Sequence, residues 1–204
     1  MNKIKLMVVA LCAATSVTTT AVAEDDFGIE SASPVIVADP VNPQPGMQLF
    51  GYKSGNRLGR WTGEWLKGSI AGLSKAPAIK SIVDKSEDYS LKALGATKSN
   101  AGRWTGFLKC KRAGVYTLTI SSGQRTGYSL RVNGKQAVLA AQGQKAVDVS
   151  LKIGWNKVDL VCHFSTPLDR VPVTITYKPK ESLSEARQLT PAMMFHDQKP
   201  EEEW

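Results

Sequence analysis

The sequence of 204 residues has few of the groups from which catalytic and metal sites are built. It contains only two histidines, His163 and His196, and three cysteines, and these residues do not show the spacing of a zinc site. No Gly-x-Ser-x-Gly nucleophile elbow is present. The central acidic residues are scattered along the chain, whereas glycoside hydrolysis needs two neighbouring carboxylates. We therefore expect neither a catalytic centre nor a resident metal ion or cofactor.

Acidic residues are missing altogether from residues 89–147, which hold ten Lys and Arg. Residues 40–180 carry 22 bases and 7 acids, a net charge of +15, although the whole chain has only +8. Both ends are acidic, with five acids and no base in residues 24–39 and six acids against two bases in residues 181–204. Such a basic body either attracts an anionic partner or is covered by its own acidic ends.

Long hydrophobic runs are absent beyond the N-terminus. There, Lys3 and Lys5 precede an apolar stretch at residues 6–17, and Ala-Val-Ala at residues 21–23 follows it. This order is typical of a signal peptide, and the stretch is too short for a membrane span. We predict cleavage after residue 23 and export to the periplasm, the cell surface or the medium. We expect no nucleic-acid partner, because the chain is exported and lacks a recognisable nucleic-acid-binding motif.

Two cysteines, Cys110 and Cys162, remain after the signal peptide is removed. An even number of cysteines in an exported chain indicates a disulfide, and two unpaired buried thiols are the alternative. Cys110 alternates in phase with Leu108, and Cys162 with Leu160, so both side chains should point into the same core. We predict a disulfide between them.

The central region has the two-residue alternation of β-strands. Asn133-Gly134 is a strong hairpin signal, and the regular spacing of the strands favours an antiparallel sandwich or barrel. Residues 69–84 instead predict a short helical turn or an irregular loop, since Gly72 and Pro77 interrupt their apolar pattern. Six segments show the alternation: residues 104–110, 115–121, 128–132, 146–153, 157–164 and 171–178.

These patterns divide the mature chain into three parts. Residues 24–45 are proline-rich and acidic, which predicts an extended linker. Residues 46–180 should form the folded domain, and residues 181–204 an acidic C-terminal tail. Within this tail, residues 189–195 are apolar and are suited to docking either on the domain or on a protein partner.

The pentapeptide Gly-Arg-Trp-Thr-Gly occurs at residues 59–63 and again at residues 102–106. Similar packing needs would explain the repetition, and a pair of binding elements is the alternative. Arg pairs with carboxylates and Trp stacks on sugar faces. Our candidate ligand-binding residues are therefore Arg60, Trp61, Arg103, Trp104 and Arg125.

Five segments, in order, resemble the protective-antigen (PA-fourteen) domain family, a secreted β-sandwich found in toxins, glycosidases and adhesins. The resemblance covers residues 46–178 and implies an all-β antiparallel sandwich. It is carried by Gly-Met-Gln-Leu-Phe-Gly-Tyr (residues 46–52), Arg-Trp-Thr-Gly-Phe-Leu (103–108), Ala-Gly-Val-Tyr-Thr-Leu (113–118), Leu-Arg-Val-Asn-Gly-Lys (130–135) and Lys-Ile-Gly-Trp-Asn (152–156).

The sequence departs from this family in the segment that follows residues 115–121. Sugar-binding members carry adjacent aspartates there, which hold a calcium ion that coordinates sugar hydroxyls. Residues 121–127 contain Arg125 and no acid, and calcium sites usually include carboxylates. We therefore expect no calcium-dependent sugar site in this loop.

Together these features predict an exported, non-catalytic binding or adhesion module. It would recognise a glycan or an anionic envelope surface without calcium. The alternative is a structural or accessory subunit of a cell-surface or secretion assembly, which would act through protein partners at residues 189–195.

Overall fold

The computed structural model describes residues 37–53, 78–95, 99–123, 126–140, 143–164 and 172–198. The predicted signal peptide, most of the predicted linker and residues 199–204 lie outside the described residues. In the described part no helix has the length and apolarity to cross a membrane. The helical elements there are two short 3-10 turns, η1 (Leu91–Leu94) and η2 (Pro191–Met193).

The fold is built from antiparallel strands. In chain order they are β1 (Pro43–Pro45), β2 (Met47–Tyr52), β3 (Lys80–Asp84), β4 (Ala101–Cys110), β5 (Gly114–Ser121), β6 (Thr126–Val132), β7 (Lys135–Ala140), β8 (Gln144–Leu151), β9 (Gly154–Phe164), β10 (Thr174–Pro179), β11 (Arg187–Leu189) and β12 (Phe195–Asp197). All six predicted strand segments correspond to observed strands, with ends shifted by a few residues.

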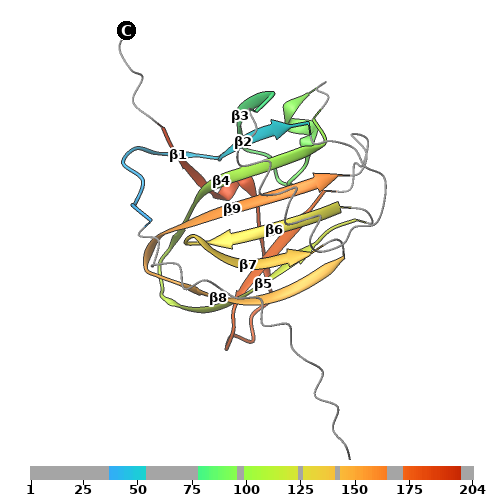
Figure 1. The fold of residues 1–204 in the computed structure, drawn as a ribbon. Helices are drawn as coiled ribbons and strands as arrows, with labels where there is room; N and C mark the ends of the chain where they lie inside the picture. Colours follow the sequence, from blue (N-terminus) through green and yellow to red (C-terminus); the bar gives the residue numbers. More distant parts are fainter. Residues whose placement is uncertain are drawn as a thin grey trace, which may run out of the picture. The chain divides into compact units, whose positions relative to one another are not determined.

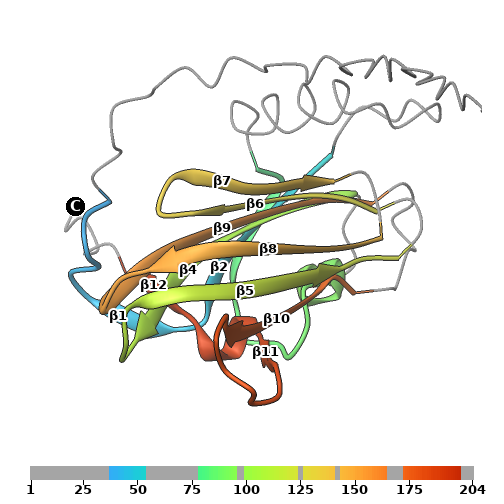
Figure 2. The same cartoon turned by 90° about the horizontal axis from the view of Figure 1, so that it is seen from below.

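The strands form two sheets (Figure 1). The larger has the order β1-β12-β4-β9-β6-β7, and β2 pairs with both β4 and β3; the smaller has the order β11-β10-β5-β8. Figure 2 shows the sheets as two layers, with β6, β7 and β9 in one and β5, β10 and β11 in the other. The predicted antiparallel sandwich is therefore confirmed.

The core lies between the sheets and follows from the alternation. On β4, Trp104 and Leu108 are buried, and on the neighbouring β9, Leu160 and Cys162 are buried. Residues between these positions point to the outer face of the larger sheet, because successive side chains of a strand point to opposite faces. Only these outward side chains of β4 and β9 can reach a ligand on that face.

The turns use the chemistry that the sequence predicted. Asn133 and Gly134 both have positive φ, 51° and 80°, as a two-residue hairpin turn requires. The turn between β8 and β9 is held by the buried Asn156, whose Oδ1 accepts from the Lys152 N–H and whose Nδ2 donates to the Lys152 carbonyl. The Asn133 side chain also donates to Asn156 Oδ1, so the two turns are linked.

The disulfide prediction is wrong, and both cysteines are free thiols. Cys110 lies opposite Gly154 at one end of the β4–β9 pair, whereas Cys162 lies opposite Gly102 near the other end. Eight residues along the strands separate them, or roughly 26 Å at the rise of a β-strand. A disulfide needs α-carbons within about 7 Å. Phase predicted the shared core, but it carries no information about position along the strand.

The C-terminal segment belongs to the sandwich, contrary to the predicted boundary at residue 180. Strand β11 pairs with β10, and β12 pairs with both β1 and β4. Leu189 and Met194 are buried in the core, so residues 189–195 dock on the domain itself. The N-terminal boundary also moves, because β1 lies within the predicted linker.

The prediction of a helical turn or irregular loop at residues 69–84 is wrong for residues 80–84. Residues 80–84 form β3, which pairs with β2. Within this strand Ile82 is partly buried and Asp84 is buried, whereas Val83 between them is exposed, as the alternation of a strand requires.

Candidate functional site

Trp104 is a core residue. Its side chain is 0% exposed, and its Nε1–H donates to Asp84 Oδ2 at 2.7 Å. Its ring meets the Tyr89 ring edge-on, with centroids 5.8 Å apart. The prediction that Trp104 contacts a ligand is therefore wrong, and the packing interpretation of the pentapeptide holds for this copy.

Arg103 points the opposite way, to the outer face of the larger sheet. Its side chain is 36% exposed, and its guanidinium lies 2.9 Å from Asp159 Oδ1 on β9. Alternation along β4 thus separates Arg103 from Trp104 rather than bringing them together. The other three candidate residues, Arg60, Trp61 and Arg125, lie outside the described residues.

A different site is formed where the larger sheet forks. Strands β2 and β12 both pair with the edge of β4 that β9 leaves open: Gln48 lies opposite Thr105, and Phe195 lies opposite Phe107. Gly106 sits between these two pairs. A β-carbon there would come within 2.8 Å of the Phe195 carbonyl oxygen and 3.0 Å of Met47 Cγ. The last glycine of the pentapeptide therefore leaves room for Met47 and the Phe195 carbonyl to approach β4 closely.

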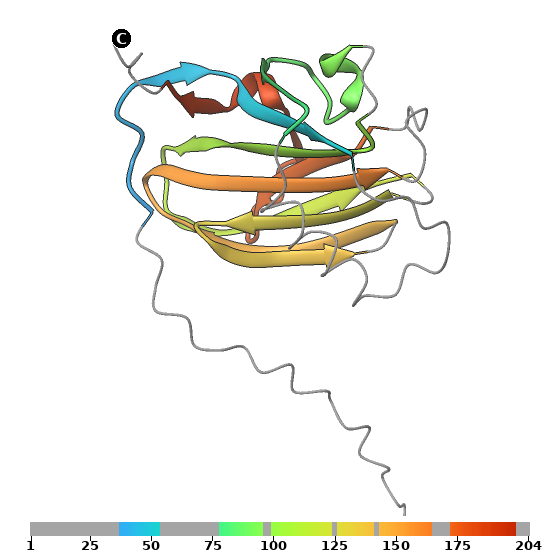
Figure 3. The same ribbon diagram turned by 45° about the horizontal axis from the view of Figure 1, so that its top comes forward.

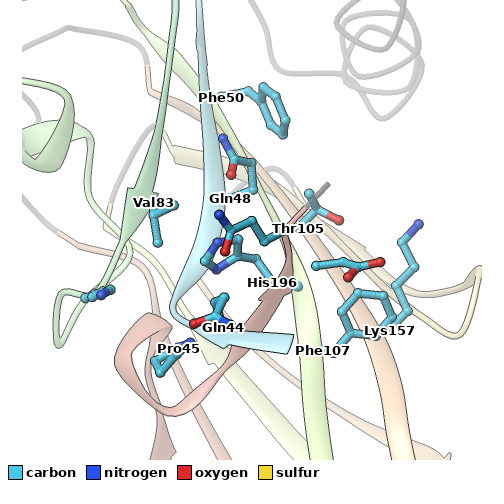
Figure 4. Close-up of a pocket in the computed structure, with 13 residues that line it drawn as sticks. Gln44, Pro45, Gln48, Phe50, Val83, Thr105, Phe107, Lys157 and His196 are labelled. Carbon is cyan, nitrogen blue, oxygen red and sulfur yellow. The ribbon is translucent and has the colours of Figure 1, made fainter. Parts of the chain in front are cut away.

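The fork opens into a groove of about 840 Å³ (Figure 4). One side is formed by the β1–β12 ribbon, which lies at the edge of the larger sheet in Figure 3. The floor is the outer face of β2, β4 and β9. The groove is lined by polar, aromatic and basic side chains that include Gln44, Gln48, Thr105, Phe107, Lys157 and His196.

Several polar groups of the groove are available to a ligand. The side chains of Gln48 and Thr105 have no hydrogen bond to another residue of the described chain. Gln44 uses one amide donor on Asn42 Oδ1, at 3.0 Å. Amide and hydroxyl groups offer donors and acceptors side by side, and this pattern suits the adjacent hydroxyl groups of a sugar.

The groove also combines aromatic surface with positive charge. Phe50 and Phe107 line it together with Lys85 and Lys157. Its acid, Asp197, accepts a hydrogen bond from the Asn42 N–H at 2.8 Å. An apolar ring beside a few polar groups is the usual composition of a small-molecule site.

Comparison with solved structures places this arrangement in a known fold. The PA14 sugar-binding domain from an RTX adhesin superposes with a TM-score of 0.53 at 17% identity, over 74% of this chain and 98% of that domain. The A domain of epithelial adhesin 9 from Candida glabrata, in complex with Galβ1-4GlcNAc, gives 0.51 at 13% identity, over 78% and 92%. The fold is that of a PA14 domain. No family model and no curated protein matches the sequence.

The same PA14-like fold is shared with longer proteins. An anti-sigma factor domain-containing protein superposes with a TM-score of 0.54 at 12% identity, over 82% of this chain and 51% of that one. This chain therefore spans about half the length of that protein.

The loop after β5 does not fit a calcium ion in the way that the protective-antigen resemblance suggests. Its described residues bring no carboxylate, and the Ser122 hydroxyl is already used on the Thr126 carbonyl at 3.1 Å. Across the described part of the chain, no three His, Cys, Asp or Glu side chains gather as a metal site would require.

The groove residues were missed by the sequence analysis, although a signal for part of the surface was present. On β4 and β9 the residues out of phase with the core include Phe107, Lys109, Trp155 and Lys157. Aromatic residues at outward positions are the unexpected feature of these strands. The contribution of β12 had no such signal, because its segment was assigned to a tail.

Proposed function

We propose that this protein is a non-catalytic carbohydrate-binding module for adhesion, which binds a glycan in the groove between β2, β4 and the β1–β12 ribbon. The observation that carries the proposal is the pair of unengaged polar side chains, Gln48 and Thr105, beside the Phe107 ring. Such a surface can hydrogen-bond sugar hydroxyls while the ring covers an apolar sugar face. The PA14-like fold, shared with a domain described as sugar-binding, supports it.

The carboxylates beside the groove support binding rather than hydrolysis. Asp159 is paired with Arg103 at 2.9 Å, and Asp197 accepts from the Asn42 N–H at 2.8 Å. A hydrolytic pair needs one carboxyl group to carry a proton and the other to act as base or nucleophile. Asp197 is the one acid that lines the groove in the described part of the chain, so no such pair faces it.

We further propose that binding needs no calcium and that the protein acts after export. The groove offers amides, a hydroxyl, rings and lysines, which bind sugars without a metal ion, and residues 121–127 contain no acid. The signal-peptide pattern at residues 1–23 supports the periplasm or the cell exterior as the location. Residues 189–195 favoured the alternative, an accessory subunit, and the burial of Leu189 and Met194 against the domain weakens that argument.

A glycan array, run with and without a chelator, tests the proposal. We expect binding that survives the chelator. In the variant Gln48→Ala/Thr105→Ala, the affinity should fall about tenfold or more, since each lost hydrogen bond contributes about 0.5–1.5 kcal/mol. Absence of glycan binding would refute the proposed function, and loss of binding in chelator would refute its calcium independence.

The chain supplies a matched control on the smaller sheet. Gln188 lies opposite Thr176 in the β10–β11 pair, in the same cross-strand arrangement as Gln48 and Thr105. The control Gln188→Ala/Thr176→Ala also removes a hydrogen bond from Gln188 to the Glu87 carbonyl, so it disturbs the fold at least as much. It should bind glycans as the parent does. An equal loss in both variants would rule out the groove as the site.

A further inference from the structure

The outer face of β4 and β9 continues beyond the groove as a regular pattern of rings and lysines. Phe107 on β4 lies opposite Lys157 on β9, and the next outward pair is Lys109 opposite Trp155. Each pair sets an aromatic ring beside a positive charge, and the order reverses from one pair to the next. We call these four residues the basic–aromatic strip.

The rings of the strip are held in place. The Trp155 ring meets the Phe195 ring edge-on, with centroids 5.2 Å apart, and the Phe107 ring edge-on at 6.5 Å. Lys109 Nζ lies 5.0 Å from the centre of the Trp155 ring. Trp155 and Phe107 both remain partly exposed, and Lys109 is exposed. The indole is therefore fixed by its neighbours without being covered by them.

The charges that face the strip and the groove are mainly positive. Lys109 and Lys157 form no ion pair with any described residue, and Lys85 lines the far side of the groove. The next outward acid on β9, Asp159, is paired with Arg103. The groove acid, Asp197, is held by the Asn42 N–H. A bound anion would thus meet lysines that have no ion-pair partner in the part of the chain that the structure describes.

The strip is continuous with the groove, because Phe107 and Lys157 belong to both. From Thr105 in the groove to Lys109 at the end of the strip, the strand advances about 13 Å. This length exceeds a single sugar ring. The surface is concave at the groove, a form that a polymer chain can follow but a flat bilayer cannot enter.

We infer that the groove and the basic–aromatic strip together bind an acidic polysaccharide, with sugar rings on Trp155 and Phe107 and carboxylate or sulfate groups on Lys109 and Lys157. This inference rests on the proposed glycan-binding function and specifies its substrate class. Aromatic side chains provide apolar contact area. Lysines provide compact charges that carry three donors each.

The test compares charged polymers with their neutral counterparts: polygalacturonate with its methyl ester, and dextran sulfate with dextran. The comparison with polygalacturonate tests carboxylate groups, and the comparison with dextran sulfate tests sulfate groups. We expect at least one charged polymer to bind about tenfold more tightly than its neutral counterpart at low salt. The preference should shrink as added salt shortens the screening length below about 10 Å.

Two charge-matched variants locate the effect. Lys109→Gln/Lys157→Gln should reduce affinity for the charged polymer about three- to tenfold, as expected for two partly exposed ion pairs. Lys145→Gln/Lys178→Gln removes two charges from strands of the smaller sheet and should change the affinity less than about twofold.

Each remaining outcome is decisive. If neutral and charged polymers bind equally, or if the two double variants lose affinity equally, the inference is overturned while the proposed glycan-binding function stands. If no polymer and no array glycan binds, both fail. If vesicles of anionic phospholipid bind through Lys109 and Lys157 whereas the polymers do not, the ligand is a lipid surface and the inference is wrong.

Discussion

Trp104 and Trp155 lie on neighbouring strands of one sheet, but Trp104 is buried in the core and Trp155 lies on the outer face. Trp104 lies opposite Leu160, is fully buried, and gives its indole N–H to Asp84 inside the core. Trp155 lies opposite Lys109 on the outer face and is only partly covered by two phenylalanine rings. The residue type is therefore a poor guide to ligand binding in a sandwich. The phase of the residue relative to the core decides its role.

Replacing each tryptophan should separate stability from binding. Trp104→Ala should lower the free energy of unfolding by about 3–5 kcal/mol, as a large cavity in a core does. Trp155→Ala should cost only about 1–2 kcal/mol, because its ring is partly exposed, but it should weaken binding of the polymers. Urea unfolding and polymer binding measure the two effects. Equal losses of stability in the two variants would contradict the comparison.

One end of the outer face is buried, and the pH dependence of the free energy of unfolding tests this burial. His163 lies on this face of β9 and is buried, and burial lowers its pKa to about 4. In the unfolded chain His163 is protonated below about pH 6.5, whereas in the folded protein it stays neutral down to about pH 4. The free energy of unfolding is therefore unaffected by His163 above pH 6.5 and decreases as the pH falls from 6.5 towards 4. The loss reaches about 3 kcal/mol at most, at 1.36 kcal/mol per pKa unit.

The variant His163→Gln isolates this contribution from other titrating groups. Its free energy of unfolding should fall less steeply between pH 6.5 and pH 4 than that of the parent. Parallel profiles for the two proteins would show that His163 takes up its proton equally well in the folded and unfolded states.

Replacing Asp84, which accepts the hydrogen bond from Trp104, should have a smaller effect on the free energy of unfolding. Asp84 accepts from the Trp104 indole and also from the Ser86 N–H, at 2.9 Å. Asp84→Ala should cost about 2 kcal/mol, because two donors lose a charged acceptor, and it should leave glycan binding unchanged. Thermal unfolding measures the cost. A loss of binding without a loss of stability would show that the inner face contributes to the site.

Alternation was sufficient to predict six of the twelve strands in the described part of the chain and the sandwich, because burial on one face imposes a two-residue period wherever the strands lie. It could not give the pairing order of the strands. Strands β2, β3 and β7 were not among the predicted segments, and β1, β11 and β12 are only three residues long, too short to show a period. Strands β1 and β12 form the ribbon, and β12 forms one arm of the fork, so the sequence could not predict the groove.

The cysteines show the same limit. Their phase placed both in the core, but a disulfide depends on position along paired strands, which only the register supplies. A thiol assay should find Cys110 reacting slowly in the folded protein and Cys162 reacting only after unfolding, because burial raises the pKa of both thiols. A reductant should not change the urea midpoint. If reduction lowered the free energy of unfolding by about 4 kcal/mol, the contribution of a disulfide that closes a loop of this length, the predicted disulfide would be supported after all.

The most direct test of the account follows the side-chain N–H resonances in a ¹⁵N NMR titration with the tightest glycan from the array. The Trp155 indole N–H and the Gln48 side-chain amide should shift on binding, and the Trp104 indole N–H should stay in place. If the Trp155 and Gln48 resonances do not move while shifts gather at residues 121–127, the binding surface lies at the loop after β5 and the groove is not the site.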